Sequence, residues 1–180
     1  MVENYELISN SEIKIMKTGV VLRINMLAPE ANEYTNDISS DHERVTLFRY
    51  PDGTEHFEKI KWYNNMTISL VFWDDVLISI QIPVNSNFYF NGINLTNIDY
   101  RDTIKKLSKL GYGFTMNQAN YEYKFDDLNL FLLLETEDEL QCAGIYSTKV
   151  KQIEEMNKRY KSKRLMQDGL TVIEFADIYA

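Results

Sequence analysis

The strongest constraint on the fold is a series of apolar runs between residues 45 and 83, separated by very short polar segments. VTLFRY is followed by PDGT, EHFEKIKWY by Asn64-Asn65, and MTISLVFW by Asp74-Asp75 and then VLISIQIP. β-Branched and aromatic runs favour strands, whereas Pro, Gly, Asn and Asp between them favour chain reversals. The pattern predicts a meander of four consecutive strands. Phe57 and Trp62 differ in parity, so we also expect a bulge or a register change near Lys59.

The other half of the sequence predicts further strands and two helices. Asp99 can cap a helix whose apolar stripe ends before Gly111, so a helix is expected over about 99–110. Further expectations are a hairpin or bent strand over 13–26, a long loop with or without a short helix over 27–44, a strand turning at Asn91-Gly92 over 88–95, three strands over 121–147, a C-terminal helix over about 149–165, and a strand or a second short helix over 168–180. Together these elements predict an α+β fold, with mostly antiparallel β-meander sheets in a single domain over 1–180.

Composition sets the class of protein. The chain has 180 residues, 44% of them hydrophobic, which suffices for a sizeable core. It contains no apolar run of the roughly 18 residues that a membrane-spanning helix needs. Its first residues, MVENYELISNSEIK, carry acids where a secretion signal carries positive charge. We therefore expect a cytoplasmic protein that does not bind membranes.

The charge balance bears on the partner. Nineteen basic and 27 acidic residues give a formal net charge of −8. Nucleic acid is a poor partner for such a chain, because binding to it depends on Lys and Arg that neutralise phosphates. A basic protein is a better one. Residues 148–166 depart from this balance with seven basic and two acidic side chains, and we interpret them as the solvated face of a helix rather than a nucleic-acid patch.

Motifs for enzyme chemistry are missing from the sequence. There is no phosphate-binding, dinucleotide-binding or nucleophile-elbow glycine pattern. The single cysteine, Cys142, stands in an apolar run, and the two histidines, His42 and His56, lack the spacing of metal ligands. We expect no catalytic residues, no cofactor and no metal.

Three acidic clusters stand between strands and are the candidate contacts. Neighbouring side chains on a strand point to opposite faces, so the Asp-Asp pairs suit hairpin tips better than a catalytic centre. The tips would then carry surface carboxylates, and whether they share one side of the sheet is left open. The expected partner-binding residues are Asp74, Asp75, Asp126, Asp127, Glu135, Glu137, Asp138 and Glu139, with Trp73 and Tyr121 as apolar anchors.

A resemblance adds to this interpretation. The segments FNGINL, DYRDTIKKL and YEYKFDDLNLFLLLETEDEL, within residues 90–147, are similar to small bacterial domains in which a helix precedes a strand meander. In size, acidity and lack of catalytic motifs, the chain resembles the immunity proteins of bacterial contact-dependent and other polymorphic toxin systems. The resemblance implies a cytoplasmic protein that binds and blocks one toxin domain, often a basic nuclease. The alternative is a structural or adaptor protein, such as a phage or assembly component, that self-associates through strand edges.

Overall fold

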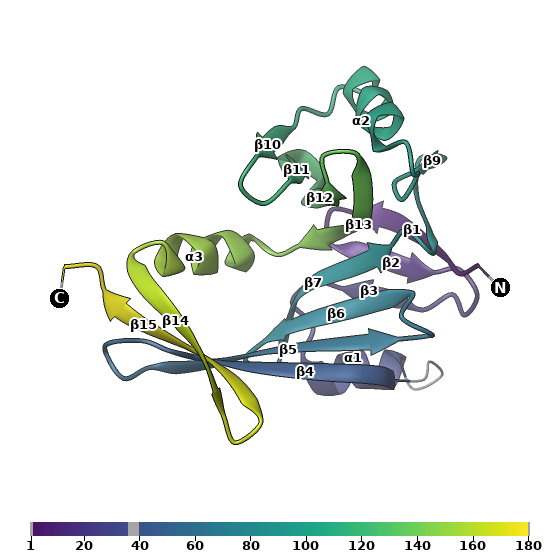
Figure 1. Ribbon diagram of the computed structural model, residues 1–180. Coiled ribbons are helices and arrows are strands. Elements are labelled where there is room, and N and C mark those ends of the chain that lie inside the picture. Colours follow the sequence, from purple (N-terminus) through teal and green to yellow (C-terminus); the bar gives the residue numbers. More distant parts are fainter. Residues whose placement is uncertain (1, 36–39, 180) are drawn as a thin grey trace.

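The structure is a computed structural model that describes residues 2–35 and 40–179 (Figure 1). Over these residues the strands form one ten-stranded and one five-stranded sheet, accompanied by three α-helices. Nearly all strand pairs are antiparallel. The parallel pairs are β1 (Asn4–Ser9) with β8 (Asn87–Phe90) and β15 (Leu170–Asp177) with β4 (Ser40–Arg49). The expected α+β class with mostly antiparallel sheets is confirmed.

The ten-stranded sheet combines the two expected meanders. The strands of the second meander and those of the first are joined where β13 pairs with β7, with Ile145 opposite Ile80. The strand order is β10 (Thr115–Asn117), β11 (Glu122–Phe125), β12 (Leu130–Thr136), β13 (Glu139–Tyr146), β7 (Val76–Pro83), β6 (Ile68–Trp73), β5 (Glu55–Tyr63), β4 (Ser40–Arg49), β15 (Leu170–Asp177) and β14 (Tyr160–Gln167).

The five-stranded sheet takes up the N-terminal hairpin and the strand pair after the first meander. Its order is β3 (Val21–Arg23), β2 (Glu12–Ile15), β1 (Asn4–Ser9), β8 (Asn87–Phe90) and β9 (Ile93–Asn94). The hairpin over 13–26 and the Asn91-Gly92 turn are thereby confirmed. The short helix allowed within 27–44 is α1 (Ala28–Tyr34), and part of that stretch, residues 36–39, lies outside the described residues.

Turn chemistry explains the meander. Gly53 adopts a φ of 85° after Pro51-Asp52, and Asp74 and Asp75 both have positive φ, at 47° and 63°. Two positive φ angles match the twist of the flanking strands in a two-residue hairpin turn. The bulge or register change expected near Lys59 is wrong, because β5 pairs regularly with both neighbours there. The register shifts instead between β6 and β7, beside Phe72.

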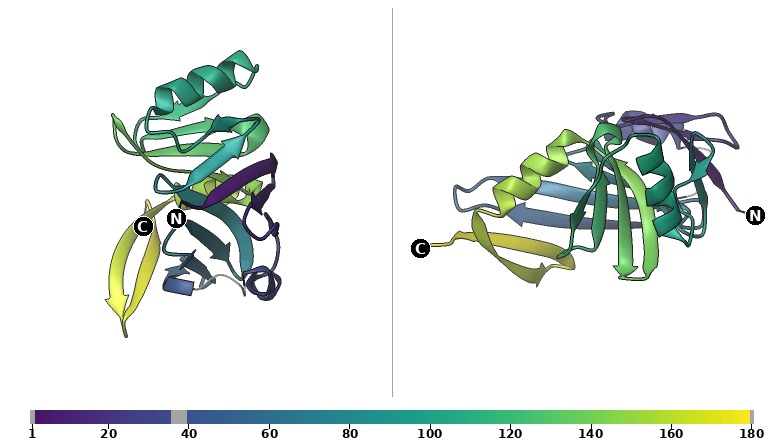
Figure 2. Two further views of the ribbon diagram at one scale, coloured as in Figure 1. Left: turned by 90° about the vertical axis from the view of Figure 1, so that its right-hand side faces the viewer. Right: turned by 90° about the horizontal axis from the view of Figure 1, so that it is seen from above.

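The central helix is confirmed as α2 (Tyr100–Lys109). The side chain of Asp99 accepts the backbone N–H of Asp102, and Gly111 ends the helix with a φ of 93°. Such capping satisfies a backbone donor that has no partner within the helix. α2 lies over the β10–β13 part of the large sheet (Figures 1 and 2).

The C-terminal helix expected over about 149–165 is wrong in its second half. α3 (Thr148–Asn157) ends early, and the next residues form β14, which pairs with β15 in a hairpin that turns at Asp168-Gly169. We call this pair the C-terminal hairpin. Val150 and Ile153 pack against the core, which holds α3, whereas the following residues alternate faces and pair with a partner strand. The segment over 168–180, left open between strand and helix, is β15 up to Asp177.

One hydrophobic cluster joins the two sheets. It contains Tyr5, Leu22 and Phe88 from the smaller sheet and Leu70 and Leu77 from the larger one, all at or near zero exposure. The Tyr5 hydroxyl and the Thr67 hydroxyl are 2.8 Å apart within it. Burial raises the pKa of Tyr5. Among the described residues, no helix has the length and apolarity required to cross a membrane.

Candidate functional site

The Asp74-Asp75 cluster is a hairpin tip whose carboxylates are engaged locally. The Asp74 carboxylate lies 2.6 Å from Nδ1 of His56 and accepts the Phe57 backbone N–H at 2.9 Å. Asp75 lies 3.6 Å from the Lys59 ammonium. These contacts stabilise the β6–β7 turn, so much of the charge at this tip is compensated by its own sheet.

The Asp126-Asp127 cluster also lies at a reversal, here a short 3-10 helix, Asp126–Leu128, between β11 and β12. Asp126 accepts hydrogen bonds from the Tyr146 hydroxyl at 2.9 Å and the Lys151 ammonium at 2.7 Å. The Lys151 and Tyr146 donors lower the pKa of Asp126, and burial together with this carboxylate raises the pKa of Tyr146. The carboxylate therefore ties α3 to the sheet.

The Glu135–Glu139 cluster forms the β12–β13 tip beside α2. Asp138 pairs with Arg101 at 2.7 Å, and the Tyr100 hydroxyl donates to the backbone carbonyl of Glu137 at 2.7 Å. Glu135, Glu137 and Glu139 are exposed, and none of these three carboxylates has an ion-pair partner among the described residues.

The three tips do not form one anionic surface. β12 runs from beside Asp126-Asp127 to beside Glu137, and a seven-residue strand spans about 20 Å. The register places the Asp74-Asp75 tip at the same strand ends as Asp126-Asp127, because Ile145 faces both Leu130 and Ile80. Two tips therefore share one end of the sheet and the third lies at the other.

The two expected apolar anchors, Trp73 and Tyr121, differ in their exposure to solvent. Trp73 is only 2% exposed and packs against Phe48 and His56, with ring centroids 4.9 and 5.3 Å apart. The expectation that Trp73 contacts a partner is wrong for the folded chain, because its position in β6 turns the ring toward α3. Tyr121 is 39% exposed and lines a cavity with Arg101 and Met116, so it is available for contact.

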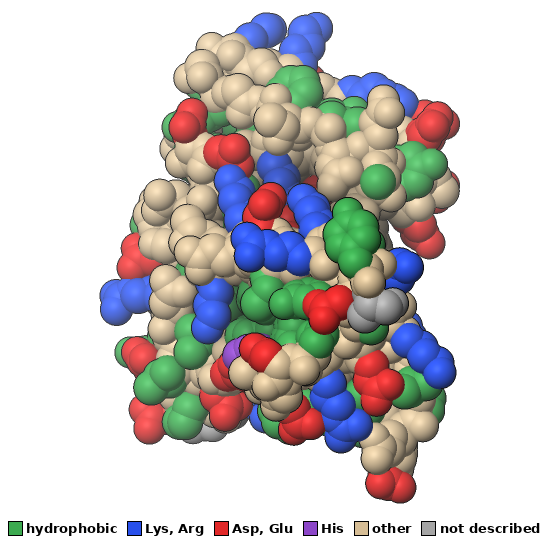
Figure 3. Space-filling model, turned by 90° about the vertical axis from the view of Figure 1, so that its left-hand side faces the viewer, with side chains coloured by type: hydrophobic (Ala, Val, Ile, Leu, Met, Phe, Trp, Pro, Cys, Tyr) green, Lys and Arg blue, Asp and Glu red, His purple; other side chains and the backbone are tan. Residues whose placement is uncertain are grey.

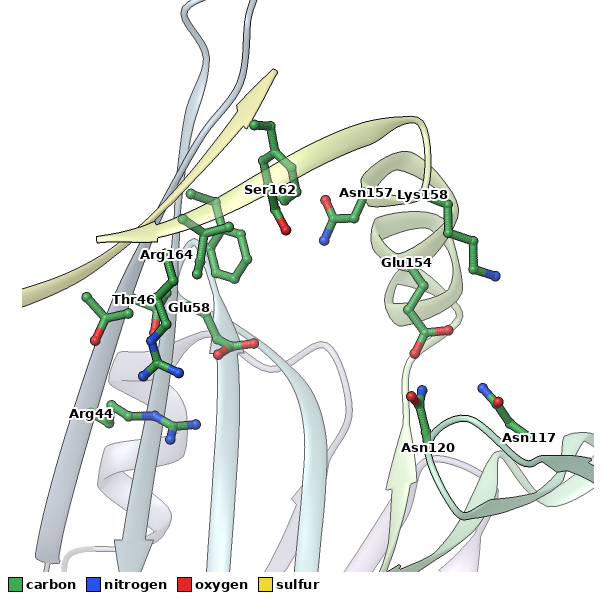
Figure 4. Close-up of a pocket in the computed structure, with 14 residues that line it drawn as sticks. Arg44, Thr46, Glu58, Asn117, Asn120, Glu154, Asn157, Lys158, Ser162 and Arg164 are labelled. Carbon is green, nitrogen blue, oxygen red and sulfur yellow. The ribbon is translucent and has the colours of Figure 1, made fainter. Parts of the chain in front are cut away.

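A cleft that the sequence did not indicate lies between α3 and the part of the large sheet formed by β5, β4, β15 and β14. Its volume is about 570 Å³, and Figure 4 shows strand residues on one side and residues of α3 and the β10–β11 loop on the other. We call it the polar cleft. It is lined by Arg44, Thr46, Phe48, Glu58, Asn117, Asn120, Glu154, Asn157, Lys158, Ser162, Arg164, Thr171, Ile173 and Phe175.

Aromatic side chains support the strand side of the polar cleft. The rings of Phe48 and Phe175 stack with centroids 6.2 Å apart, and Phe175 also stacks on Tyr50 at 4.7 Å. Alternation along β14 and β15 brings Ser162 and Arg164 to the same face as Phe175. The C-terminal hairpin therefore contributes both apolar and charged groups to the cleft.

Ion pairs and a hydrogen bond hold α3 opposite this wall. The Lys124 ammonium lies 3.3 Å from carboxylate oxygens of both Glu122 and Glu154, and the Tyr50 hydroxyl donates to the Asn157 side-chain oxygen at 2.7 Å. Burial raises the pKa of Glu122 despite the opposing effect of Lys124. These contacts fix the width of the cleft.

The polar groups of the cleft have mixed charge. Burial raises the pKa of Glu58, with Arg44 acting in the opposite direction. Arg44 also lies over the Trp62 ring, 5.8 Å from its centroid. Among the residues that the structure describes, no group of His, Cys, Asp and Glu is arranged to hold a metal ion. Burial raises the pKa of Cys142 to about 12, so its thiol is protonated at neutral pH.

Basic side chains are frequent along α3 and β14, the two elements on either side of the cleft. Residues 149–164 contain seven Lys and Arg and two Glu. Of the seven, Lys151 and Lys158 have acidic partners. The remaining five have no ion-pair partner in residues 2–35 and 40–179: they are Lys149, Arg159, Lys161, Lys163 and Arg164. On this side of the molecule Lys and Arg gather across the middle of the surface, above a hydrophobic patch (Figure 3).

The fold is α+β, with an open polar cleft beside a hairpin whose first strand, β14, carries Lys161, Lys163 and Arg164. No family model matches the chain, and no solved structure matches it. A curated protein that the chain resembles is the type II restriction enzyme HpaII of Haemophilus parainfluenzae, at 25% identity over 154 residues. The match covers 72% of this chain and 42% of the enzyme, so the chain spans less than half of that relative's length.

Proposed function

We propose that this chain is a DNA-binding module that contacts duplex DNA through its C-terminal hairpin. The observation that carries the proposal is the group of basic side chains on and beside β14 that have no acidic partner among the described residues. Lys161, Lys163 and Arg164 are exposed on this strand. Elsewhere most basic side chains are already paired with carboxylates, so the hairpin is where phosphates gain most from contact.

The geometry of the hairpin supports duplex DNA as the ligand. The tip at Asp168-Gly169 projects away from the body of the protein (Figures 1 and 2). The major groove of B-DNA is about 12 Å wide and admits a two-stranded ribbon. Lys161 and Lys163 lie further along β14, on the face opposite the one that Ser162 and Arg164 turn toward the cleft, so both lysines can contact phosphates beside the groove.

The net charge of −8 weighs against this role when it is taken as an average. The charge is unevenly distributed, however: the C-terminal hairpin balances its three basic side chains with Asp168, Glu174 and Asp177, and the cationic excess comes from residues 149–164, with seven basic and two acidic side chains. At physiological ionic strength charges more than about 8 Å apart are largely screened. The similarity to a restriction enzyme agrees with a role on DNA, and such a role would place the chain in the DNA-containing compartment, consistent with the expected cytoplasmic location.

Fluorescence anisotropy with a labelled duplex, measured over a range of salt concentrations, tests the proposal. If Lys161 and Lys163 each contact a phosphate, they contribute about −1.8 to the slope of log K against log salt. The double variant Lys161→Gln/Lys163→Gln should reduce the steepness of this slope by about 1.8. The control is Lys105→Gln/Lys109→Gln on α2, which removes the same charge from two exposed lysines.

Equal effects of the two double variants would contradict the proposal, because they would show that only total charge matters. Absence of duplex binding by the unaltered protein at low salt would also refute it. The expected result is a loss confined to the hairpin variant, with both variants unfolding at the temperature of the unaltered protein.

A second candidate is an immunity protein that neutralises a basic toxin domain. The observation that favours it is the β12–β13 tip, where Glu135, Glu137 and Glu139 are exposed and have no ion-pair partner in the described part of the chain. Such a tip would speed association with a basic protein. Reversing these three charges should slow association with a toxin domain encoded beside this gene, without lowering the melting temperature. Unchanged association would exclude the tip as the contact.

A further inference from the structure

We infer that the polar cleft receives one unpaired nucleotide of the bound DNA. This inference rests on the proposed function and concerns what enters the cleft beside the C-terminal hairpin. A duplex is about 20 Å across and cannot enter a cavity of about 570 Å³, whereas single small ligands occupy sites of about 300–1,000 Å³. The cleft therefore has room for one nucleotide that has left the duplex, but not for the duplex itself.

One end of the cleft suits a phosphate. Arg44 on β4 and Arg164 on β14 both extend into it at the strand side (Figure 4). Arg164 has no acidic partner among the described residues, and Arg44 has only the nearby Glu58 carboxylate. Guanidinium groups bind phosphate oxygens through paired, charge-assisted hydrogen bonds. Two of them at one end of the cleft define where the backbone of the nucleotide lies.

The other end suits the edge of a base. Asn157 on α3 and Asn117 and Asn120 near the β10–β11 loop present amides from the opposite side of the cleft (Figure 4). The side-chain oxygen of Asn157 accepts the Tyr50 hydroxyl, so its NH₂ group is left to donate. Amides offer both donors and acceptors and pair with base edges, which a duplex presents only in its grooves.

Two aromatic rings also line the cleft. Phe48 and Phe175 line the cleft and stack on each other. A base stacks on such rings whatever its identity, and this stacking offsets the cost of removing it from the duplex. Groups that can bind a phosphate, stack on a base and pair with its edge thus occur in one cavity.

The test compares a matched duplex with a duplex of the same sequence that carries one unpaired nucleotide, by anisotropy at fixed salt. We expect the second to bind about tenfold more tightly, since its nucleotide is already free to enter. Asn120→Ala should abolish this preference. Gln118→Ala is the matched control, because Gln118 is on the same loop but lines a different cavity with Tyr121.

The outcomes separate this inference from the DNA-binding proposal. Equal binding of the two duplexes, or a preference that survives Asn120→Ala, overturns the inference, and the DNA role stands if Lys161→Gln/Lys163→Gln still weakens binding. Calorimetry with the four deoxynucleoside monophosphates tests the alternative ligand, a free nucleotide in place of a nucleotide that belongs to DNA. Binding of a free monophosphate without binding of either duplex overturns both the DNA role and this inference.

Discussion

Gly144 in β13 offers a sharp test of the fold, because this position has no room for a side chain. A Cβ placed on Gly144 would collide with the backbone carbonyl oxygen of Ile80 on β7 and would lie 2.7 Å from Cζ of Phe131 on β12. The Phe131 ring could move, whereas the Ile80 carbonyl belongs to the central strand pair that joins the two meanders. Gly144→Ala must therefore displace β13 from β7.

The magnitude follows from this contact. Overpacking a core typically costs about 1–3 kcal/mol, and a collision with sheet backbone belongs at the upper end or beyond, so we expect a loss of about 3 kcal/mol. For a chain of this size 1 kcal/mol corresponds to about 2–4 °C, which gives a fall in melting temperature of about 6–12 °C. Thermal unfolding followed by circular dichroism, with a urea titration at 25 °C, measures both quantities.

The matched control is Gly113→Ala. An added Cβ meets nothing within 4 Å at Gly113, and its φ lies outside the positive range, so the same chemical change should alter stability by less than about 0.5 kcal/mol. Combining Gly144→Ala with Phe131→Leu should recover only part of the loss, since the Ile80 carbonyl remains. If Gly144→Ala melted within 2 °C of Gly113→Ala, the pairing of β12, β13 and β7 described here would be wrong.

Two further predictions concern pH. Burial raises the pKa of Glu58, so the stabilisation from its protonation is present below its unfolded pKa and is lost as pH rises through the folded value. The variant Glu58→Gln should therefore have a higher melting temperature than the unaltered protein at pH 7, and the difference should shrink toward pH 4. A lower melting temperature of the variant at pH 7 would contradict this. The pKa of Asp126 is lowered, so its contribution is present above the unfolded pKa and is lost as pH falls through the folded value. By urea titration, Asp126→Asn should lower the free energy of unfolding by up to about 1 kcal/mol at pH 7 and by almost nothing near pH 2. The neighbouring Asp127→Asn should lower it little at either pH. Equal losses of stability in the two variants would refute the role of Lys151.

The strands were predictable where local chemistry agreed with the tertiary structure. Each turn of the first meander carries residues that tolerate positive φ, such as Gly53 or the Asp74-Asp75 pair, between runs that favour strands. The helix prediction failed after Asn157 because Lys, Arg, Gln and Met are good helix formers, yet pairing with β15 decides the structure. The Asp168-Gly169 dipeptide, a strong hairpin signal, could have revealed this.

The candidate site was predictable only in part. The turn positions of the acidic residues follow from the sequence, but their places on opposite ends of β12 depend on strand order, which a single sequence does not determine. The polar cleft could not be foreseen, because its walls come from segments more than 100 residues apart, such as Arg44 and Arg164. Trp73 was mistaken for a surface anchor because composition does not indicate which face of β6 is covered, and α3 covers it.

The distribution of charge decides which proposal the structure favours. An acidic surface would attract a basic protein more strongly if its carboxylates converged. The carboxylates of Asp74, Asp75, Asp126 and Asp138, however, each contact a basic side chain of this chain. The remaining carboxylates of the β12–β13 tip lie at the other end of the sheet from the other two tips. The basic groups show the opposite arrangement. They are concentrated within 16 residues of sequence, remain largely unpaired, and stand beside a cleft with amides and stacked rings. Since screening confines electrostatic attraction to nearby charges, the DNA-binding proposal depends on the excess of cations over residues 149–164 and not on the net charge of −8.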